Sequence, residues 1–176
     1  MARKIMGWSK CSISFGTATG TTTMPTSLTS VGTIKDKSSV LESQDGEELS
    51  AVATGGAEVG HEDQEGKFVL STRIIEPDNS VLIALGLGTA VSQSDNLAVK
   101  THVCPGEYGV KVEPKNVGAY GIEAPLCSIK AKPGWSESEG NFLDLTVSIL
   151  KIDEDSTWYT RVKKAAPVSG GGDGEG

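Results

Sequence analysis

Residues 124–163 read APLCSIKAKPGWSESEGNFLDLTVSILKIDEDSTWYTRVK and contain three stretches in which apolar and polar residues alternate. Alternation with a period of two residues is typical of β-strands that bury one face. The pattern predicts strands at about 126–131, 141–152 and 157–163, joined by polar turns. We therefore expect an antiparallel meander, with residues 153–156 forming the hairpin turn between the last two strands.

The longest of these strands predicts which side chains the domain buries. Its apolar residues fall on one face, which we expect in the core: Leu143, Leu145, Val147 and Ile149. Its polar residues fall on the opposite face: Asp144, Thr146 and Ser148. We expect this second face to meet solvent or a neighbouring subunit, because a strand shows its two faces to different environments.

Further strands follow from the same alternation. The first covers about residues 10–15, where Cys11, Ile13 and Phe15 alternate with Ser12 and Ser14. A central strand covers 67–75, which is apolar on both faces. Asp45-Gly46 suits the positive φ angles of a tight turn, so we expect a hairpin over 38–54. Residues 54–66 contain few apolar side chains and are expected to form an exposed excursion between strands.

The second half of the chain adds another hairpin and one helix. Alternation over 97–103 and again over 108–112 predicts two strands joined at Pro105-Gly106. Residues 78–86 predict the one short helix, because Asp78 or its neighbours can cap its first turn and Gly86 or Gly88 suits its end. The glycines of Gly86-Leu87-Gly88 are better explained by this helix end than by a dinucleotide-binding loop.

These elements indicate a mainly β protein, an antiparallel β-sandwich or barrel with one short flanking α-helix and long loops. A length of 176 residues suits a single domain, expected over 1–168. Residues 169–176 are expected to form a flexible, Gly-rich acidic tail, because they offer nothing to pack.

Composition excludes several classes of function. A formal net charge of −7 opposes binding to a phosphate backbone. Three widely spaced cysteines predict neither a disulfide framework nor a zinc site, and free thiols suit a reducing compartment. The first 15 residues lack the continuous apolar core of a secretion signal, and no window approaches 18 apolar residues, so we expect no membrane anchor.

Two groups of residues are candidates for chemical sites. His102 and Cys104 lie two apart on a predicted strand, which would allow a nucleophile–base pair, but a surface His and a buried Cys is the better interpretation. Acidic residues with one histidine gather in the excursion and could ligate a hard cation: Glu58, His61, Glu62, Asp63 and Glu65. Their spacing does not match a calcium loop, so a solvated acidic loop is favoured. We predict no enzyme activity, no metal and no cofactor.

The order of elements resembles the tail tube proteins of long-tailed phages and the tube proteins of contractile injection systems. The resemblance lies in a β block, one helix, a second β block and a closing meander with a Lys132-Pro-Gly-Trp135 corner. It implies a β-sandwich subunit that forms hexameric rings, which stack into a hollow tube through which DNA passes without specific binding. It also implies other tail proteins as partners, assembly in the host bacterial cytoplasm and a place in the virion tail.

The resemblance implies roles for two groups of residues. Residues 54–67 would match the loop that reaches the neighbouring ring, and the candidate ring-stacking residues are Gly55, Gly56, Glu58, His61, Glu62, Asp63 and Glu65. Asp144, Thr146 and Ser148 would face the lumen or a neighbouring subunit, and carboxylates would line an acidic lumen. The alternative is a monomeric β-sandwich binding module or adhesin that recognises a glycan or host surface. An exposed aromatic platform would favour that alternative.

Overall fold

The computed structural model describes residues 7, 10–46, 48–52, 54–56, 58–63, 65–152 and 157–167, with the backbone alone described for 48–52 and 58–63. Strands account for 49% of the chain and helix for 4%, and the strand pairs are antiparallel. The predicted mainly β fold with one short helix is therefore confirmed. The sheets are arranged as in a sandwich and do not close into a barrel.

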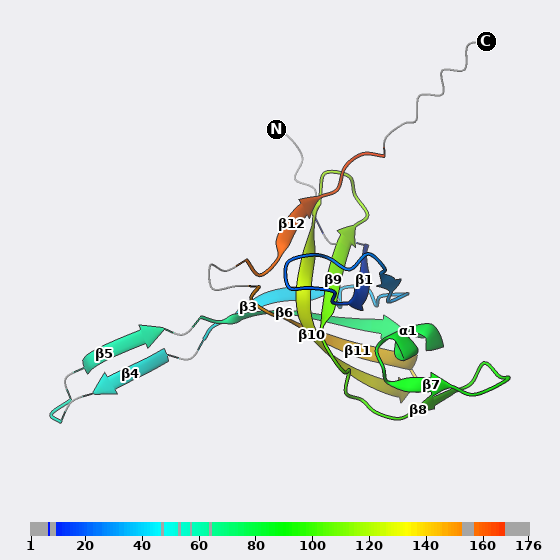
Figure 1. Ribbon diagram of the computed structural model, residues 1–176, viewed down its shortest axis with the longest axis horizontal. Helices are drawn as coiled ribbons and strands as arrows, with labels where there is room; N and C mark the ends of the chain where they lie inside the picture. The colour runs from blue at the N-terminus through cyan, green and yellow to red at the C-terminus, as the bar shows by residue number, and fades with distance from the viewer. Residues whose placement is uncertain are drawn as a thin grey trace, which may run out of the picture.

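One eight-stranded sheet forms the body of the molecule (Figure 1). Its strands follow the order β2, β1, β9, β10, β11, β6, β3, and β12 also pairs with β10. Their bounds are Thr29–Ser30 for β2, Cys11–Thr17 for β1, Tyr108–Pro114 for β9, Tyr120–Ser136 for β10, Gly140–Ile149 for β11, Lys67–Ile75 for β6, Val40–Gln44 for β3 and Thr160–Lys163 for β12.

Strand β10 joins the two halves of this sheet. Its first residues pair with β9 on one edge and with β12 on the other, whereas residues 127–136 pair with β11. The register with β9 shifts between Ala124 and Cys127. Such an irregularity bends a strand and increases its twist, so one long strand can serve both halves of the sheet.

The core lies on one face of the folded sheet and follows the predicted alternation. The four apolar side chains of β11 are between 0% and 2% exposed: Leu143, Leu145, Val147 and Ile149. Leu70 and Ile74 of β6 are fully buried opposite them, and Ile13 and Phe15 of β1 reach the same cluster. The predicted faces of the first strand and of β11 are confirmed.

Helix α1, Asn79–Ala84, covers part of this core. It ends where predicted, because Gly86 adopts a φ of 73° and its N–H donates to the carbonyl of Ile83, while the N–H of Leu87 donates to the carbonyl of Leu82. This pair of bonds is a Schellman motif, which satisfies carbonyls that a helix end leaves free. The predicted side-chain cap is wrong, since Asp78 makes no capping hydrogen bond through its side chain.

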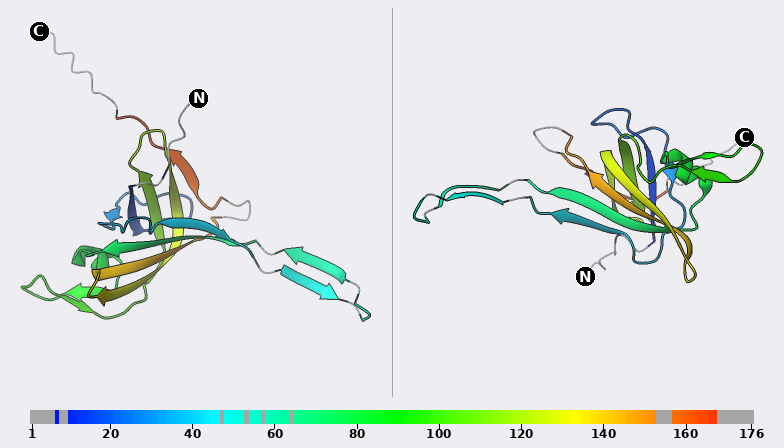
Figure 2. Two further views of the ribbon diagram at one scale, coloured as in Figure 1. Left: turned by 180° about the vertical axis from the view of Figure 1, so that it is seen from behind. Right: turned by 90° about the horizontal axis from the view of Figure 1, so that it is seen from below.

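A two-stranded arm extends from the body beyond β3 and β6 (Figures 1 and 2). It consists of β4, Glu48–Val52, and β5, Glu58–Asp63, which pair with each other. The predicted hairpin over 38–54 is wrong, because β3 pairs with β6 and Asp45-Gly46 leads into the arm. The predicted excursion of 54–66 is one side of this ribbon. We call residues 45–66 the arm.

Three other sequence predictions are wrong. Residues 97–103 do not pair with β9, since β8, Leu97–Val99, pairs with β7, Gly88–Ala90. Strand β12 pairs with β10 and not with β11, so the closing meander is incomplete. The expected corner at Lys132–Trp135 lies inside β10. The predicted turn at 153–156 and the predicted tail at 169–176 lie outside the described residues.

Candidate assembly surfaces

The arm carries the residues predicted to stack one ring on the next. Gly55 and Gly56 form its exposed tip with φ angles of 110° and 85°, which a residue with a Cβ rarely adopts. The backbone of β5 holds four further candidates: Glu58, His61, Glu62 and Asp63. Glu65 lies at the base of the arm. The structure thus brings all seven candidates onto one projecting ribbon.

The base of the arm is tied to the body by an ion pair, and aromatic side chains of the body pack beside it. The Lys151 Nζ lies 2.5 Å from Glu65 Oε2, and this ammonium holds the pKa of Glu65 below its usual range. The Phe68 ring packs edge to face against Trp158 and Tyr159, at centroid distances of 5.6 and 5.2 Å. These contacts fix the point from which the arm leaves the sheet.

The arm also concentrates charge. Residues 45–66 contain seven acidic residues and no Lys or Arg, a formal charge of −7 that equals the charge of the whole chain. The rest of the chain is therefore balanced, with 16 acidic and 16 basic residues. The net charge of the chain does not show that its excess negative charge lies in one segment, whereas the charge of residues 45–66 does.

The outward face of β11 carries the second set of predicted residues. Asp144, Thr146 and Ser148 are half-buried on the face opposite the core. Their partners across the strand pairs include Arg73 on β6, and Lys132 and Lys130 on β10. Asp144, Thr146, Ser148 and their direct cross-strand partners on β6 and β10 together include one carboxylate and three basic side chains. These residues do not supply the unpaired carboxylates that the resemblance implied for an acidic lumen.

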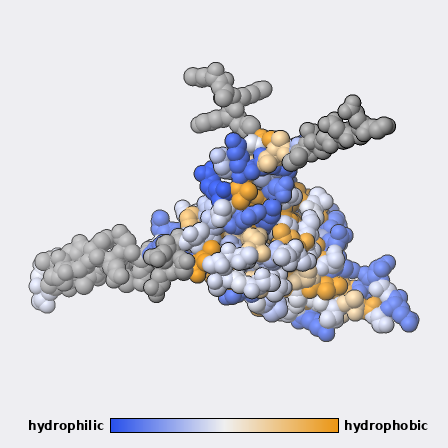
Figure 3. Space-filling view, turned by 45° about the horizontal axis from the view of Figure 1, so that its top comes forward, coloured by the Kyte–Doolittle hydropathy of each residue, from blue (hydrophilic) through white to orange (hydrophobic). Residues whose placement is uncertain are grey.

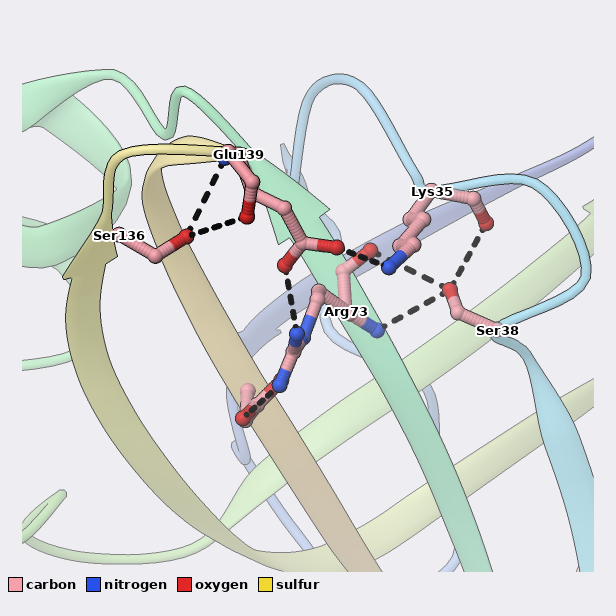
Figure 4. Close-up of polar contacts among 7 residues, drawn as sticks. Lys35, Ser38, Arg73, Ser136 and Glu139 are labelled. Carbon is pink, nitrogen blue, oxygen red and sulfur yellow. Dashed lines mark hydrogen bonds and ion pairs between the residues drawn. The ribbon is translucent and has the colours of Figure 1, made fainter.

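Asp144 belongs to an ionic cluster that sequence reasoning missed (Figure 4). The guanidinium of Arg73 donates two hydrogen bonds to its carboxylate, from Nε at 2.6 Å and Nη2 at 2.8 Å. Arg73 Nη1 lies 2.7 Å from Glu139 Oε2, and Glu139 also pairs with Lys35. Arg73 further stacks over the Phe142 ring, 4.3 Å from its centroid. The cluster links β6, β11, the β10–β11 turn and the segment before β3.

The cluster shifts the pKa values of Arg73 and Glu139 in the directions that ion pairing requires. Asp144, and then Glu139, raise the pKa of Arg73. Lys35, and then Arg73, lower the pKa of Glu139. Opposite charges at hydrogen-bond distance favour the ionised forms. Asp144 and Arg73 are direct neighbours across β11 and β6. Predicting the cluster would have required knowing that these two strands pair, and one sequence does not show which strands pair.

A third surface lies at the end of the body formed by β9, β10 and β12. It gathers five basic residues, which we call the basic end: Lys111, Lys115, Arg161, Lys163 and Lys164. Glu113 and Glu123 lie among them, with Lys164 Nζ 2.9 Å from Glu113 Oε1 and Lys111 Nζ 3.1 Å from Glu123 Oε1. A hollow of about 290 Å³ opens there, lined by charged groups and by Val162 and Ile122.

The pairs at the basic end do not cancel its positive charge. Glu113 and Glu123 each pair with at least one ammonium group. Lys164, and then Lys111, lower the pKa of Glu113. The Gly118 N–H donates to the Lys164 carbonyl and the Lys164 N–H donates to the Ala119 carbonyl, so the turn that begins at Lys115 is joined to the chain directly after β12. Arg161 lies over the Tyr120 ring at 4.7 Å. Five basic residues against two acidic ones leave this end with a formal charge of +3.

The candidate nucleophile pair is split between two environments. His102 is exposed, whereas Cys104 is buried, as predicted. Burial raises the pKa of the Cys104 thiol, which disfavours the thiolate that a nucleophile requires. In the part of the chain that the structure describes, no three His, Cys, Asp or Glu side chains are placed to hold a metal ion.

The aromatic residues are dispersed. Trp135 is 66% exposed and Tyr120 is 47% exposed, but they lie near opposite ends of the 17-residue strand β10. Trp158 and Tyr159 pack on Phe68, and Tyr108 is buried. Within the described residues, these side chains therefore form no continuous stacking platform.

No helix among the described residues has the length and apolarity that a bilayer crossing demands. No protein-family model matches the chain, and no curated protein matches it.

Proposed function

We propose that this protein is a structural subunit that assembles with copies of itself into rings, and that the rings stack into a hollow tube of the phage tail type. The projecting arm is the observation that carries the proposal. A two-stranded ribbon without a core is marginally stable in water by itself. An arm of this kind gains its stability from a surface outside its own domain, and a second copy of the chain supplies one.

The shape of the subunit suits repeated assembly. The arm leaves the β3–β6 side of the body and points away from it in each view (Figures 1 and 2). From Gln44 to Thr54 an extended strand covers roughly 33 Å, at about 3.3 Å per residue. Such a reach crosses from one subunit onto the next. A contact between two different surfaces of one chain is head-to-tail, so it generates closed rings or open stacks.

The body offers the lateral surfaces that a ring needs. Strands β3 and β12 each pair with one neighbour among the described strands, which leaves one edge of each strand for another chain. Unpaired strand edges are templates for association. The outward face of β11, with Asp144 held by Arg73, is polar and rigid, and it suits either a lumen wall or a subunit contact.

Electron microscopy of concentrated, purified protein tests the proposal. We expect rings or tubes by negative stain and a mass in light scattering that is a multiple of 18.3 kDa. A variant in which an Asn-Gly turn replaces residues 47–64 should keep a folded body and lose tubes. A strictly monomeric wild-type protein at high concentration would contradict the proposal, and glycan binding by that monomer would support the adhesin alternative.

The β7–β8 hairpin provides the matched control. It also projects from the body, and its tip, residues 92–95, can be replaced by the same Asn-Gly turn, because the Val91 N–H donates to the Asn96 carbonyl just outside it. We expect this variant to form tubes as the wild type does. Equal loss of tubes in both variants would show that shortening any hairpin disrupts assembly, and the arm would then have no special role.

A further inference from the structure

We infer that the acidic arm of one copy docks on the basic end of another copy, so that opposite charges on two distant parts of one chain guide its assembly. This inference rests on the proposed function and names the two surfaces that meet. It starts from the charge distribution, which is −7 over residues 45–66 and +3 over the five basic and two acidic residues of the basic end.

The basic end is accessible. All four residues of β12 are exposed, and Lys115 is exposed beside them. Figure 3 shows strongly hydrophilic residues gathered at this end around a small apolar area. Lys115 and Lys163 take part in no ion pair with other described residues. Their charges are therefore available to a partner.

The basic end also has the shape to receive a ribbon. Strand β12 pairs with β10 along one edge, and no other described strand pairs with its second edge. An extended segment can add to such an edge through main-chain hydrogen bonds, with side chains supplying specificity. The hollow beside β12 places Lys111, Lys163 and Lys164 around the apolar side chains of Ile122 and Val162. A ribbon rich in carboxylates matches this combination of edge and charge.

The partner is another copy because the arm does not reach its own basic end. In Figure 1, β12 runs toward the top of the body, whereas the arm extends to the lower left and points away from β12. The arm also points away from β12 when the molecule is seen from behind (Figure 2). An acidic arm and a basic end that cannot meet within one chain form a head-to-tail contact between chains, which repeats from copy to copy. Long-range attraction between them also speeds correct encounter and weakens as salt screens it.

Charge reversal tests this contact. The arm variant Glu48→Lys/Glu58→Lys/Glu62→Lys/Asp63→Lys changes the formal charge of the arm from −7 to +1, and the end variant Lys115→Glu/Lys163→Glu changes that of the basic end from +3 to −1. Each variant therefore places like charges on the two surfaces. We expect each alone to need at least tenfold more protein than wild type to associate in sedimentation velocity. Their equimolar mixture, and the variant that combines all six substitutions, should associate at a lower concentration than either variant alone, because opposite charges again face each other. Unchanged unfolding midpoints confirm that each variant is folded.

Lys37→Glu/Lys100→Glu is the matched control, since it makes the same change in charge at two exposed lysines outside the arm, the basic end and the outward face of β11. We expect it to associate as wild type does. If it weakens association as much as the end variant, or if the mixture fails to recover, the inference is overturned. The experiment distinguishes the proposed function from the proposed contact.

Tubes that form equally well in every variant would support the proposed function and contradict this contact. Recovery in the mixture without tubes would support the contact and contradict the tube.

Discussion

The β6–β11 pair of the body and the β4–β5 pair of the arm are both antiparallel ribbons, yet they are stabilised in different ways. In the body, each strand turns alternate side chains into a shared core, and Leu70, Ile74 and Leu143 are fully buried. In the arm, β4 and β5 pair only with each other among the described strands. The same antiparallel pairing therefore serves two purposes. In the body the strands are stabilised by the core that covers one face, whereas in the arm no other described strand of the same chain pairs with them, which suits contact with another chain.

The largest expected effect is the loss of a core side chain in the body. Leu143→Ala should lower the free energy of unfolding by about 2–5 kcal/mol, because it removes apolar contacts and leaves a cavity in a packed interior. Urea unfolding measures the change. Thr146→Ala, on the outward face of the same strand, should change this free energy by less than about 0.5 kcal/mol. Equal effects would mean that the two faces of β11 are not distinct.

The second largest expected loss of stability comes from substituting the glycine at the C-terminal end of α1. Gly86→Ala should cost about 1–2 kcal/mol, because an L side chain is disfavoured at a φ of 73°. A Cβ there would also lie 2.8 Å from Pro105 Cδ. Gly20→Ala is the control, since a Cβ at Gly20 meets nothing within 4 Å. Thermal unfolding should lower the midpoint for Gly86→Ala alone, and a similar shift in both variants would contradict the strained-turn explanation.

The ionic cluster on the outward face should matter less than the core. Arg73→Ala removes the guanidinium from Asp144 and Glu139 and should lower the unfolding midpoint by less than Leu143→Ala does, because the cluster is partly open to solvent. Lys132→Ala, whose side chain is exposed on the neighbouring strand, should leave the midpoint unchanged. A larger loss for Arg73→Ala than for Leu143→Ala would show that the cluster, and not the core, holds β6 to β11.

Acid should weaken the body through the same groups. The folded-state pKa values of Glu139, Glu113 and Glu65 lie below the ordinary 4.5. Their contribution to stability is therefore present above that pH and is lost as the pH falls through the folded-state values. The urea midpoint should decline below about pH 4.5. Glu139→Gln should flatten part of this decline, and an unchanged pH profile in that variant would exclude Glu139 as a source.

The smallest expected effect on stability belongs to the arm. Replacing residues 47–64 by an Asn-Gly turn should leave the unfolding midpoint of the body unchanged, because the Glu65–Lys151 pair and the aromatic contacts of Phe68 remain. Circular dichroism during thermal unfolding measures it. A marked destabilisation would mean that the arm is part of the body, and the contrast between the two ribbons would then disappear.

Local patterns predicted faces better than partners. The alternation in β11 and in the first strand identified the buried side chains correctly, and one of the two glycines predicted for the end of α1, Gly86, ends it. The same alternation over 38–54 and 97–103 was assigned to hairpins that do not form. A period of two residues states which side chains share a face, but it does not state which strand lies alongside. Asp45-Gly46 favours a tight turn, yet the pairing of β3 with β6 prevails there.

By itself, the sequence determined the mainly β class, the apolar face of β11, the position of the helix and the placement of all seven net negative charges within residues 45–66. These properties are local, since they depend on periodicity, on glycine conformation and on composition. Only the tertiary structure decided that this acidic stretch is a projecting ribbon, that Asp144 is held by Arg73, and that basic residues far apart in the chain gather at one end of the body. Those outcomes depend on which strands pair across long separations, and that choice is made by the packing of the whole core.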